Sequence, residues 1–397
     1  MLSRATHRRP RRGGALVAGI VAVVVAVATL GVAVFTLNTP KAGARAAREA
    51  GEARVSHLAR ESTLDPASTL GSAVGATALG LRTSFYEPPV LADPANPGMI
   101  VNSGADQPDP FVFVQNGRYY LFTSKDEVPQ DVPVRSATVF GQWGPPSDAL
   151  LDPPAWATAN AMWAPDVAQF GNDYMLYFTS ELAGSSPPTM CIGDAISANP
   201  AGPYLPSQVP FICQQSMGGS IDPRVFVDSN GQPSMVWKSD QNALKENIPT
   251  EIWSQPLSAD GLHLLGAPTE IFSPDEAWQN SIVEAPQMVL VNGAYYLFYS
   301  GGWFNQPSYA IGVARCTGPD GPCHDTSSSP FLGSDAQGAG PGEESVFSNA
   351  AGIWLIYTPW CSTLPNPGPP RPVALAHLGF QPDGPYLAAP LETSSKN

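Results

Sequence analysis

Five acidic residues introduce five similar segments of this 397-residue chain. They are Asp109, Asp166, Asp222, Glu284 and Glu344. Two carboxyl groups in different protonation states can hydrolyse a glycosidic bond, because a charged carboxylate activates water while a protonated carboxyl gives its proton to the leaving oxygen. This chemistry requires the carboxyls to lie close together, so the elements that carry them decide whether it can occur.

Each acid is followed by a short apolar run, a glycine turn and a second strand rich in aromatic or apolar residues. The turn glycines are Gly117, Gly171, Gly231, Gly293 and Gly352, at spacings of 54 to 62 residues. A period near 60 built from short strands and glycine turns is typical of a β-propeller, in which each unit is one four-stranded blade. The sequence therefore predicts an all-β, five-bladed β-propeller over residues 105–391, with the five acids converging on its central axis.

The composition agrees with a turn-rich β protein, since the chain has 37 Gly and 43 Pro but only 14% charged residues. Its charge is distributed unevenly. After residue 61 the chain carries 10 basic and 31 acidic side chains, a formal charge of −21. Such a surface repels phosphate backbones, so we expect no nucleic-acid partner, whereas a neutral ligand such as a sugar is compatible.

The N-terminal region has the pattern of a membrane anchor. Residues 1–12 contain five arginines, and residues 13–37 are apolar and uncharged. The apolar stretch is long enough to cross a hydrocarbon core of ~30 Å at ~1.5 Å per residue. We expect residues 1–12 to be cytoplasmic, residues 13–37 to form a transmembrane signal anchor and the rest to lie outside the cell membrane. A cleaved signal peptide, and hence secretion, is the alternative.

Two further segments flank the predicted propeller. Residues 38–104 are rich in Ala, Ser, Gly and Pro with little periodicity and are interpreted as a flexible linker or stalk. Residues 392–397 are interpreted as a disordered tail.

All five cysteines follow the apolar segment, where thiols would be oxidised. Cys316 and Cys323 bracket a turn of Gly and Pro, so we expect a disulfide between them. Cys191 and Cys213 are the second expected pair, which leaves Cys361 over. Connectivity cannot be derived from spacing alone, and no CxxC pair suggests a metal-thiolate site.

The segments around three of the acids resemble glycoside hydrolase family 43, a family of five-bladed propeller enzymes that act on arabinans, xylosides and related linkages. Asp109 in the Asp-Pro-Phe segment matches the general base, and Glu284 in Val-Glu-Ala-Pro matches the general acid. Asp166 in Trp-Ala-Pro-Asp matches the carboxylate that tunes the pKa of the acid. The resemblance implies an inverting, single-displacement mechanism and an oligo- or polysaccharide substrate.

A structural role is the alternative for each acid, because carboxylates often bond backbone amides at the ends of propeller strands. For Asp222 and Glu344 this capping role is the preferred interpretation, although Asp222 is kept as a substrate-binding candidate. Arg371 matches a family arginine that reaches the sugar, and its guanidinium suits paired hydroxyls. Trp163, Trp303 and Phe304 are predicted to stack on sugar rings, with core packing as the alternative.

The resemblance also implies a histidine in the fifth blade that holds calcium through water in some members. In this chain the segment is Gly-Pro-Gly-Glu, with Glu343 at the histidine position. A carboxylate can attract a hard cation, but the substitution makes calcium doubtful, so no cofactor and no metal ligand are predicted. The histidines His263, His324 and His377 lack metal-ligand spacing.

Two other functions stay open at this point. A carbohydrate-binding propeller without catalysis would keep the pocket, and the altered Gly-Pro-Gly-Glu segment supports it. A retaining, fructan-active enzyme would require an Asn-Asp-Pro-Asn nucleophile and a Glu-Cys-Pro acid, whereas this chain has Gln107-Pro108-Asp109-Pro110 and Glu284-Ala285-Pro286. A serine nucleophile is not expected, because there is no Gly-x-Ser-x-Gly elbow.

Overall fold

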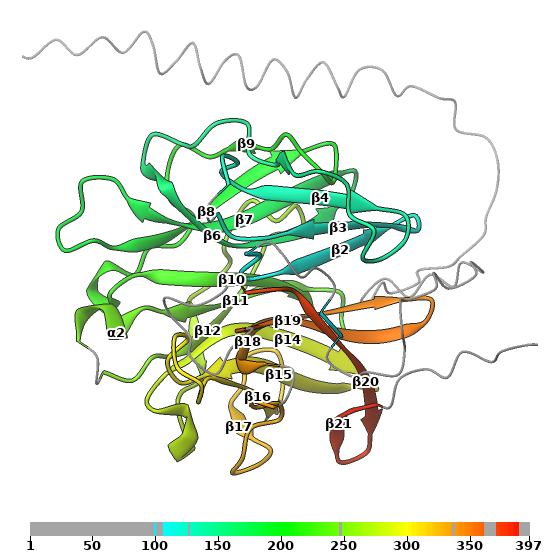
Figure 1. Ribbon diagram of the computed structural model, residues 1–397. Coiled ribbons are helices and arrows are strands. Elements are labelled where there is room, and N and C mark those ends of the chain that lie inside the picture. The colour runs from blue at the N-terminus through cyan, green and yellow to red at the C-terminus, as the bar shows by residue number, and fades with distance from the viewer. Residues whose placement is uncertain are drawn as a thin grey trace, which may run out of the picture. The chain divides into compact units, whose positions relative to one another are not determined.

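The computed structural model describes residues 99–100, 106–125, 128–245, 248–335, 338–360 and 371–388. In these residues the strands form five separate antiparallel sheets, as the sequence predicted (Figure 1). Blade 1 consists of β2 (Phe111–Gln115), β3 (Arg118–Phe122), β4 (Pro133–Ala137) and β5 (Ser147–Asp148). Blade 2 consists of β6 (Ala157–Phe170), β7 (Asp173–Leu182), β8 (Met190–Ser197) and β9 (Leu205–Pro206).

Blades 3 and 4 have the same meander of four consecutive strands. Blade 3 consists of β10 (Ser220–Val227), β11 (Pro233–Ser239), β12 (Ile252–Pro256) and β13 (Thr269–Phe272). Blade 4 consists of β14 (Val283–Val291), β15 (Ala294–Gly301), β16 (Ala310–Cys316) and β17 (Cys323–Asp325). The helices in the described residues are short: η1 (Gln215–Met217), α2 (Gln241–Leu244) and η2 (Ala277–Gln279).

Blade 5 differs from the other blades because its sheet contains a strand from before blade 1 as well as strands from the C-terminal part of the chain. Its first three strands are β18 (Ala339–Asn349), β19 (Gly352–Trp360) and β20 (Ala374–Gln381). Two short strands, β1 (Met99–Ile100) and β21 (Gly384–Leu387), both pair with β20. A strand from before blade 1 therefore joins the last sheet. It lies inside the range expected as a linker, whose remaining residues 38–98 and 101–104 lie outside the described residues.

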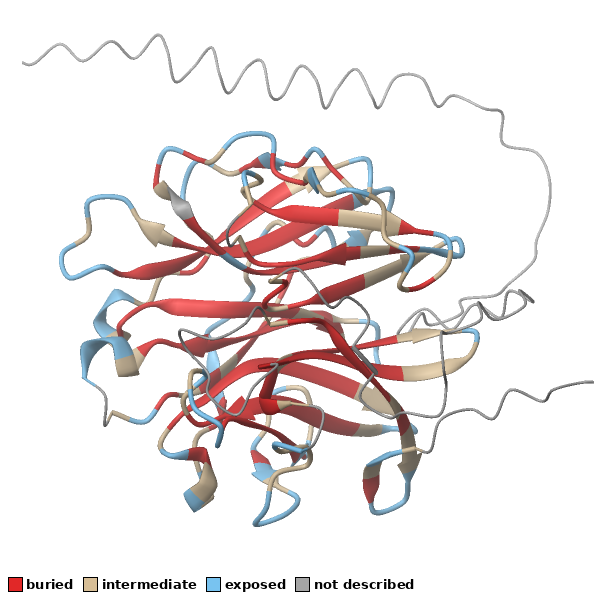
Figure 2. Ribbon diagram, viewed as in Figure 1, coloured by how far each residue is buried: buried red, intermediate tan, exposed pale blue. Residues whose placement is uncertain are grey.

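The five sheets are held together by apolar side chains between neighbouring blades. One cluster of buried residues lies between each adjacent pair, from blades 1 and 2 around to blades 5 and 1. Figure 2 shows the strands as almost continuously buried and the loops as exposed. Because both faces of each sheet are covered, the second strands carry apolar residues at nearly every position, as in Leu176 and Phe178 on the two sides of Tyr177.

The glycine turns lie where the repeats predicted them, between the first two strands of blades 1 to 4, and in blade 5 Gly352 is the first residue of β19. In two of these turns both central residues have positive φ, at Asn116 and Gly117 and at Asn292 and Gly293. This backbone matches the type I′ turn, whose twist suits a two-residue hairpin. The first strands of consecutive blades contact one another, from β2 to β6, β10, β14, β18 and back to β2, so they form the innermost ring.

Both expected disulfides are present, between Cys316 and Cys323 and between Cys191 and Cys213. Cys361 lies outside the described residues, as do the predicted transmembrane segment 13–37, the cytoplasmic segment 1–12 and the tail 392–397. Within the part of the chain that the structure describes, no helix is long and apolar enough to cross a membrane.

Candidate active site

The innermost strands of blades 2 to 5 share a break in register beside a residue with positive φ. This residue is Ala164, Asp222, Ala285 or Glu343, and Asp109 has the corresponding place before β2. The residue after it is Pro110, Pro165, Pro223, Pro286 or, in blade 5, Glu344. Residues other than glycine rarely adopt positive φ, and such conformations concentrate at functional sites. The repeat of this feature makes the hub of the ring a candidate site.

The five acids were predicted to have equivalent places in their blades. When the blades are aligned on the positive-φ residue, the acids fall at different positions. Asp109 and Asp222 share this position with Glu343, whereas Glu284 stands one residue before it and Asp166 two residues after its own Ala164. Successive side chains along a strand point in opposite directions, so a shift of one or two residues changes what an acid contacts. Electrostatic interactions join Asp109, Asp222, Glu284 and Glu343 at the hub, whereas Asp166 contacts Val225 and Arg224.

The neighbouring second strands place one side chain opposite each register break. In blades 2 to 5 these residues are Thr179, Lys238, Ser300 and Thr358. In blade 1, Ser124 has the corresponding place two residues after β3, where its N donates to Pro108 O at 3.0 Å. In three cases the hydroxyl accepts a hydrogen bond from the positive-φ residue of the next blade, from Ala164 N at 2.7 Å, Asp222 N at 3.1 Å and Glu343 N at 2.9 Å. These bonds satisfy buried amides and fix each blade against the next.

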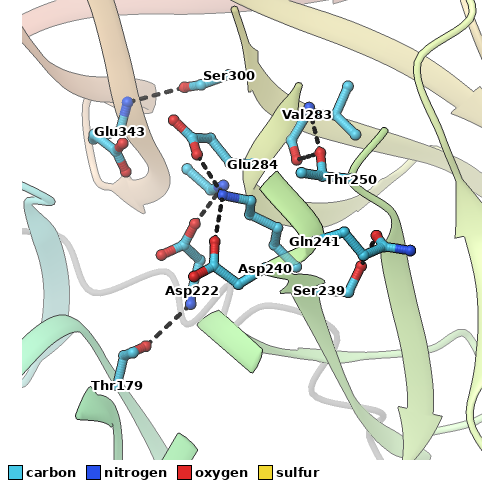
Figure 3. A network of polar contacts seen from close by, with 12 residues as sticks. Thr179, Asp222, Ser239, Asp240, Gln241, Thr250, Val283, Glu284, Ser300 and Glu343 are labelled. Carbon is cyan, nitrogen blue, oxygen red and sulfur yellow. Dashed lines mark hydrogen bonds and ion pairs between the residues drawn. The ribbon is translucent and has the colours of Figure 1, made fainter. Parts of the chain in front are cut away.

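Blade 3 breaks this pattern because Lys238 cannot accept a hydrogen bond. The next amide, Ala285 N, instead donates to Asp222 Oδ2 at 2.9 Å, a backbone contact of the kind that the capping interpretation expects. The Lys238 ammonium is freed to contact Glu284 Oε2 at 2.8 Å and Asp240 Oδ1 at 3.2 Å. Figure 3 shows Asp222, Glu284 and Glu343 around this space. The lysine in place of Ser or Thr thus puts a cation beside the acids, at a position that binds the backbone of the next blade elsewhere in the ring.

The carboxyls at the hub are in unequal electrostatic environments. Burial, followed by the charge of Glu284, raises the pKa of Asp222 to about 7, although Lys238 opposes the shift. Burial and the charges of Asp109, Glu284 and Asp222 raise the pKa of Glu343 well above its usual range. Burial lowers the pKa of Lys238, but Glu284, Asp240 and Asp222 outweigh this effect and raise it. Groups whose pKa values are pushed apart in this way are suited to acid–base catalysis.

Asp109 lies at the blade 1 side of the hub. Ser124 donates a hydrogen bond to Asp109 Oδ2, and the same Ser124 oxygen accepts the bond from Ala164 N. Asp109 is partly exposed, while Asp222 and Glu284 are each 8% exposed. Of the acids named by sequence, it is therefore the one most accessible to water.

Asp166 does not have the position that the sequence predicted for it. It is 2% exposed and accepts a hydrogen bond from Val225 N at 3.0 Å, and its other oxygen lies 3.6 Å from Arg224 Nη1. Burial raises the pKa of Asp166 to about 6, while Arg224 lowers it. Asp166 thus ties blade 2 to blade 3 and does not adjoin Glu284. The carboxyl that does adjoin Glu284 is that of Asp222.

Glu344 is also a buried structural residue. Its Oε2 accepts a hydrogen bond from the Ser300 hydroxyl at 2.6 Å, and burial raises its pKa to about 8. Among the described residues, no three His, Cys, Asp or Glu side chains are arranged to hold a metal ion. Glu343 occupies the place at which the resemblance implies a histidine, so the histidine of the calcium arrangement is absent from the hub.

The predicted sugar-binding residues lie around the same hub. Trp163 has the place in blade 2 that Glu284 has in blade 4, and its side chain is 40% exposed. Phe304 is 43% exposed and Trp303 partly exposed, both in the loop between β15 and β16. Arg371 stacks on Trp360 at 5.3 Å and binds Asp106, three residues before Asp109, through its backbone N at 2.6 Å.

The sequence analysis did not predict Lys238 and Tyr309 as site residues. It named Glu343 only as the residue at the position of a calcium-binding histidine. The signal for Lys238 is present in the repeats, because a lysine replaces Ser or Thr at one position of one blade. A signal for Asp222 is also present, because Asp109 and Asp222 are each followed directly by a proline, whereas Asp166 follows one. An alignment of the repeats on this proline would have matched Asp109 with Asp222 and not with Asp166. Tyr309 carries no such signal, since it comes from a loop.

Several carboxyls with unequal environments, gathered at a propeller hub beside exposed aromatic rings, suit the cleavage of a glycosidic bond. This arrangement defines the class of carbohydrate-active β-propellers. The chain belongs to glycosyl hydrolases family 43, whose family model matches residues 101–386. The resemblance found in the motifs is therefore confirmed.

Relatives with known names are similar over about half of the chain. A beta-D-galactofuranosidase of Aspergillus niger is 26% identical over 215 residues, which are 51% of this chain and 57% of the relative. An extracellular endo-alpha-(1->5)-L-arabinanase of Bacillus subtilis is 30% identical over 205 residues, 47% of this chain and 40% of the relative. The chain thus spans between two fifths and three fifths of the length of these relatives.

Solved structures show the same fold. A thermostable family-43 glycoside hydrolase matches with a TM-score of 0.65 at 24% identity, covering 73% of this chain and 96% of that one. An exo-1,5-alpha-L-arabinanase from a bovine ruminal metagenomic library matches with a TM-score of 0.57 at 19% identity, covering 72% and 98%. The five-bladed architecture is therefore shared almost end to end with these proteins.

Proposed function

We propose that the protein is a glycosidase that hydrolyses arabinofuranosyl or xylosyl linkages of a polysaccharide by an inverting, single-displacement mechanism. The observation that carries the proposal is the meeting of Asp109, Asp222 and Glu284, from three different blades, at the hub of the ring. The names of the relatives, an arabinanase, an arabinofuranosidase and a galactofuranosidase, support a furanoside substrate.

Each carboxyl has a role that its environment supports. Asp109 is the base, because it is the most exposed of the three and can reach a water molecule. Glu284 is the acid that protonates the leaving oxygen. Asp222 replaces Asp166 as the carboxylate that tunes the acid, since a charged neighbour disfavours a second negative charge on Glu284. An inverting pair leaves ~6.5 to 9.5 Å between base and acid for the attacking water.

The experiment that tests the proposal is hydrolysis of arabinan, arabinogalactan and xylan, followed by proton NMR of the first product. An inverting enzyme releases a sugar of opposite anomeric configuration to the substrate. Retained configuration would contradict the single displacement and favour a covalent intermediate, as in the retaining alternative. Binding of oligosaccharides in a thermal-shift assay without release of reducing ends would favour the carbohydrate-binding alternative, which the presence of Glu343 supports.

The assignment of the tuning role to Asp222 and not to Asp166 is tested by the same substitution at both positions. Asp222→Asn should lower kcat/KM about 100-fold on substrates with poor leaving groups, because the charge beside Glu284 is lost. Asp166→Asn should leave kcat/KM within about threefold and lower the Tm, since a buried partner of Arg224 is neutralised. Steady-state kinetics and thermal unfolding of both variants measure these effects. A larger kinetic loss in Asp166→Asn would restore the role first predicted for Asp166.

A second prediction concerns the exposed ring of Trp163. Trp163→Ala should raise KM about 2- to 10-fold, with little change in kcat, because a stacked ring is worth about 0.5 to 1.5 kcal/mol. Tyr386→Ala is the control, since Tyr386 is similarly exposed at 41% but lies on the outer strand β21. Equal changes in the two variants would show that Trp163 does not bind the sugar.

The proposal includes export. Both disulfides lie C-terminal to the apolar segment 13–37, in the part of the chain that the sequence predicts to be exported, and disulfides persist in oxidising compartments. Three relatives are also named as extracellular. We expect the protein to stay attached to the cell membrane through residues 13–37, and secretion after cleavage of this segment is the alternative. Fractionation of the producing cells distinguishes them, because an anchored protein stays with the membranes.

A further inference from the structure

Tyr309 joins two carboxyls at the hub. Its side chain is 2% exposed, and its Oη lies 2.7 Å from Glu284 Oε1 and 2.7 Å from Glu343 Oε1. Gly342 permits this approach, because a Cβ at that position would lie 2.0 Å from the Tyr309 ring. The glycine of the fifth-blade segment therefore positions a hydroxyl between an acid of blade 4 and an acid of blade 5.

The contacts of Tyr309 with Glu284 and Glu343 determine a proton count. A tyrosine hydroxyl carries one hydrogen, so it can donate to only one of the two carboxyls. An ionised carboxylate can only accept, and a contact of 2.7 Å between two oxygens without a hydrogen would be repulsive. One of the two carboxyls must therefore be protonated and must donate to Tyr309, while Tyr309 donates to the other.

Lys238 decides which carboxyl holds the proton. Its ammonium forms an ion pair with Glu284 Oε2 at 2.8 Å. Glu343 faces the carboxyls of Asp109 and Asp222, and with burial their charges raise the pKa of Glu343 well above its usual range. In the free protein the proton therefore belongs to Glu343, and the Tyr309 hydroxyl points toward Glu284.

We propose that Glu343 stores the proton that Glu284 gives to the leaving group, and that Tyr309 passes it between them. This inference rests on the proposed function, because it assigns the source of the acid proton in that reaction. In the transfer, the O–H bond of the Glu343 carboxylic acid breaks and a bond to Tyr309 Oη forms. The original O–H bond of Tyr309 breaks at the same time and a bond to Glu284 Oε1 forms.

The transfer neither gains nor loses a proton, since one negative charge moves from Glu284 to Glu343. Lys238 remains paired after the change, because Asp240 Oδ1 lies 3.2 Å from its ammonium. The titratable and charged groups that face the pair are Asp109, Asp222 on β10, Lys238 on β11, Tyr309 before β16 and Glu344 on β18.

Glu343→Gln tests the proposal, because glutamine can still hydrogen-bond Tyr309 but has no acidic proton to pass on. The expected result is a loss of about 10- to 100-fold in kcat on a natural oligosaccharide. Activated aryl glycosides, whose leaving group needs no proton, should be cleaved at nearly the wild-type rate. KM should change little for both substrates, since Glu343 does not bind the sugar.

Two further variants separate the proton store from a structural role. Glu344→Gln removes the adjacent buried carboxyl, which bonds Ser300 and not Tyr309, and it should show no dependence on the leaving group. Tyr309→Phe breaks the connection and should reproduce the loss of Glu343→Gln. The double variant should lose no more than either single variant, because both act on one chain of bonds.

A spectroscopic titration tests the shared proton without activity. In protein labelled with ¹³C at the glutamate carboxyls, one signal that Glu343→Gln removes should stay protonated at a pH where ordinary glutamates are ionised. An ionised Glu343 at neutral pH, equal losses on both substrate types, or additive effects of the two variants would each overturn the proposal. Failure of the wild type to cleave any glycoside would instead refute the proposed function, while the titration would still report on the proton.

Discussion

Asp109→Asn is expected to reduce hydrolysis at least about 1,000-fold on every substrate, whatever its leaving group. The reason is that water must be activated in each turnover, and an amide cannot take a proton from it. Asparagine can still hydrogen-bond Ser124, so the blade contacts around Ala164 should persist. Single-turnover rates on an oligosaccharide and on an activated aryl glycoside, with thermal unfolding as the control for folding, measure this effect.

The uniformity of the loss is what identifies a base. A Tm within a few degrees of the wild type would show that the variant is folded. If Asp109→Asn lost activity on the oligosaccharide but retained it on the aryl glycoside, Asp109 would be acting on the leaving group and the assignment of base and acid would have to be exchanged.

Glu284→Gln should produce the opposite pattern, a loss of about 100- to 10,000-fold that depends on the leaving group. Poor leaving groups require a proton from Glu284, whereas an activated aryl group departs without one. The aryl substrate should therefore be cleaved within about tenfold of the wild-type rate. The same pair of substrates measures both variants, so each serves as the control of the other.

Lys238 complicates the interpretation of Glu284→Gln, since the amide leaves its buried ammonium with Asp240 alone. Loss of a buried charge partner is destabilising, so kinetic data should be taken well below the Tm of the variant. Equal loss on both substrates in a folded protein would contradict an acid role for Glu284.

The blade count, the hairpin turns and three of the acids at the hub, Asp109, Asp222 and Glu284, could be predicted from the sequence. The period of the glycine turns is a local pattern, and alternating or continuous apolar runs report which faces are covered. The motifs around Asp109 and Glu284 identified the residues that the structure brings together. The contacts of Asp166 with Val225 and Arg224 could not be foreseen in this way, because matching short strings ignores a register break that shifts a side chain to another environment.

The residues that complete the hub depend on contacts between distant parts of the chain. Tyr309 reaches Glu284 and Glu343 across 25 and 34 residues of sequence, from a loop whose position no local pattern describes. Asp222 assumed its contact with Ala285 because Lys238 replaces the hydroxyl that serves this purpose in other blades. Such a substitution is visible in the sequence, but its consequence is visible only when the blades are packed together.

The sequence alone determined that this chain forms a ring of five similar sheets with carboxyls at its centre, because each sheet is encoded locally by its own repeat. Only the tertiary structure decided which carboxyls share a proton, which are paired with a cation and which merely join two blades. Protonation depends on burial and on charges within a few ångströms, and these distances are set by the closing of the ring and not by any single segment.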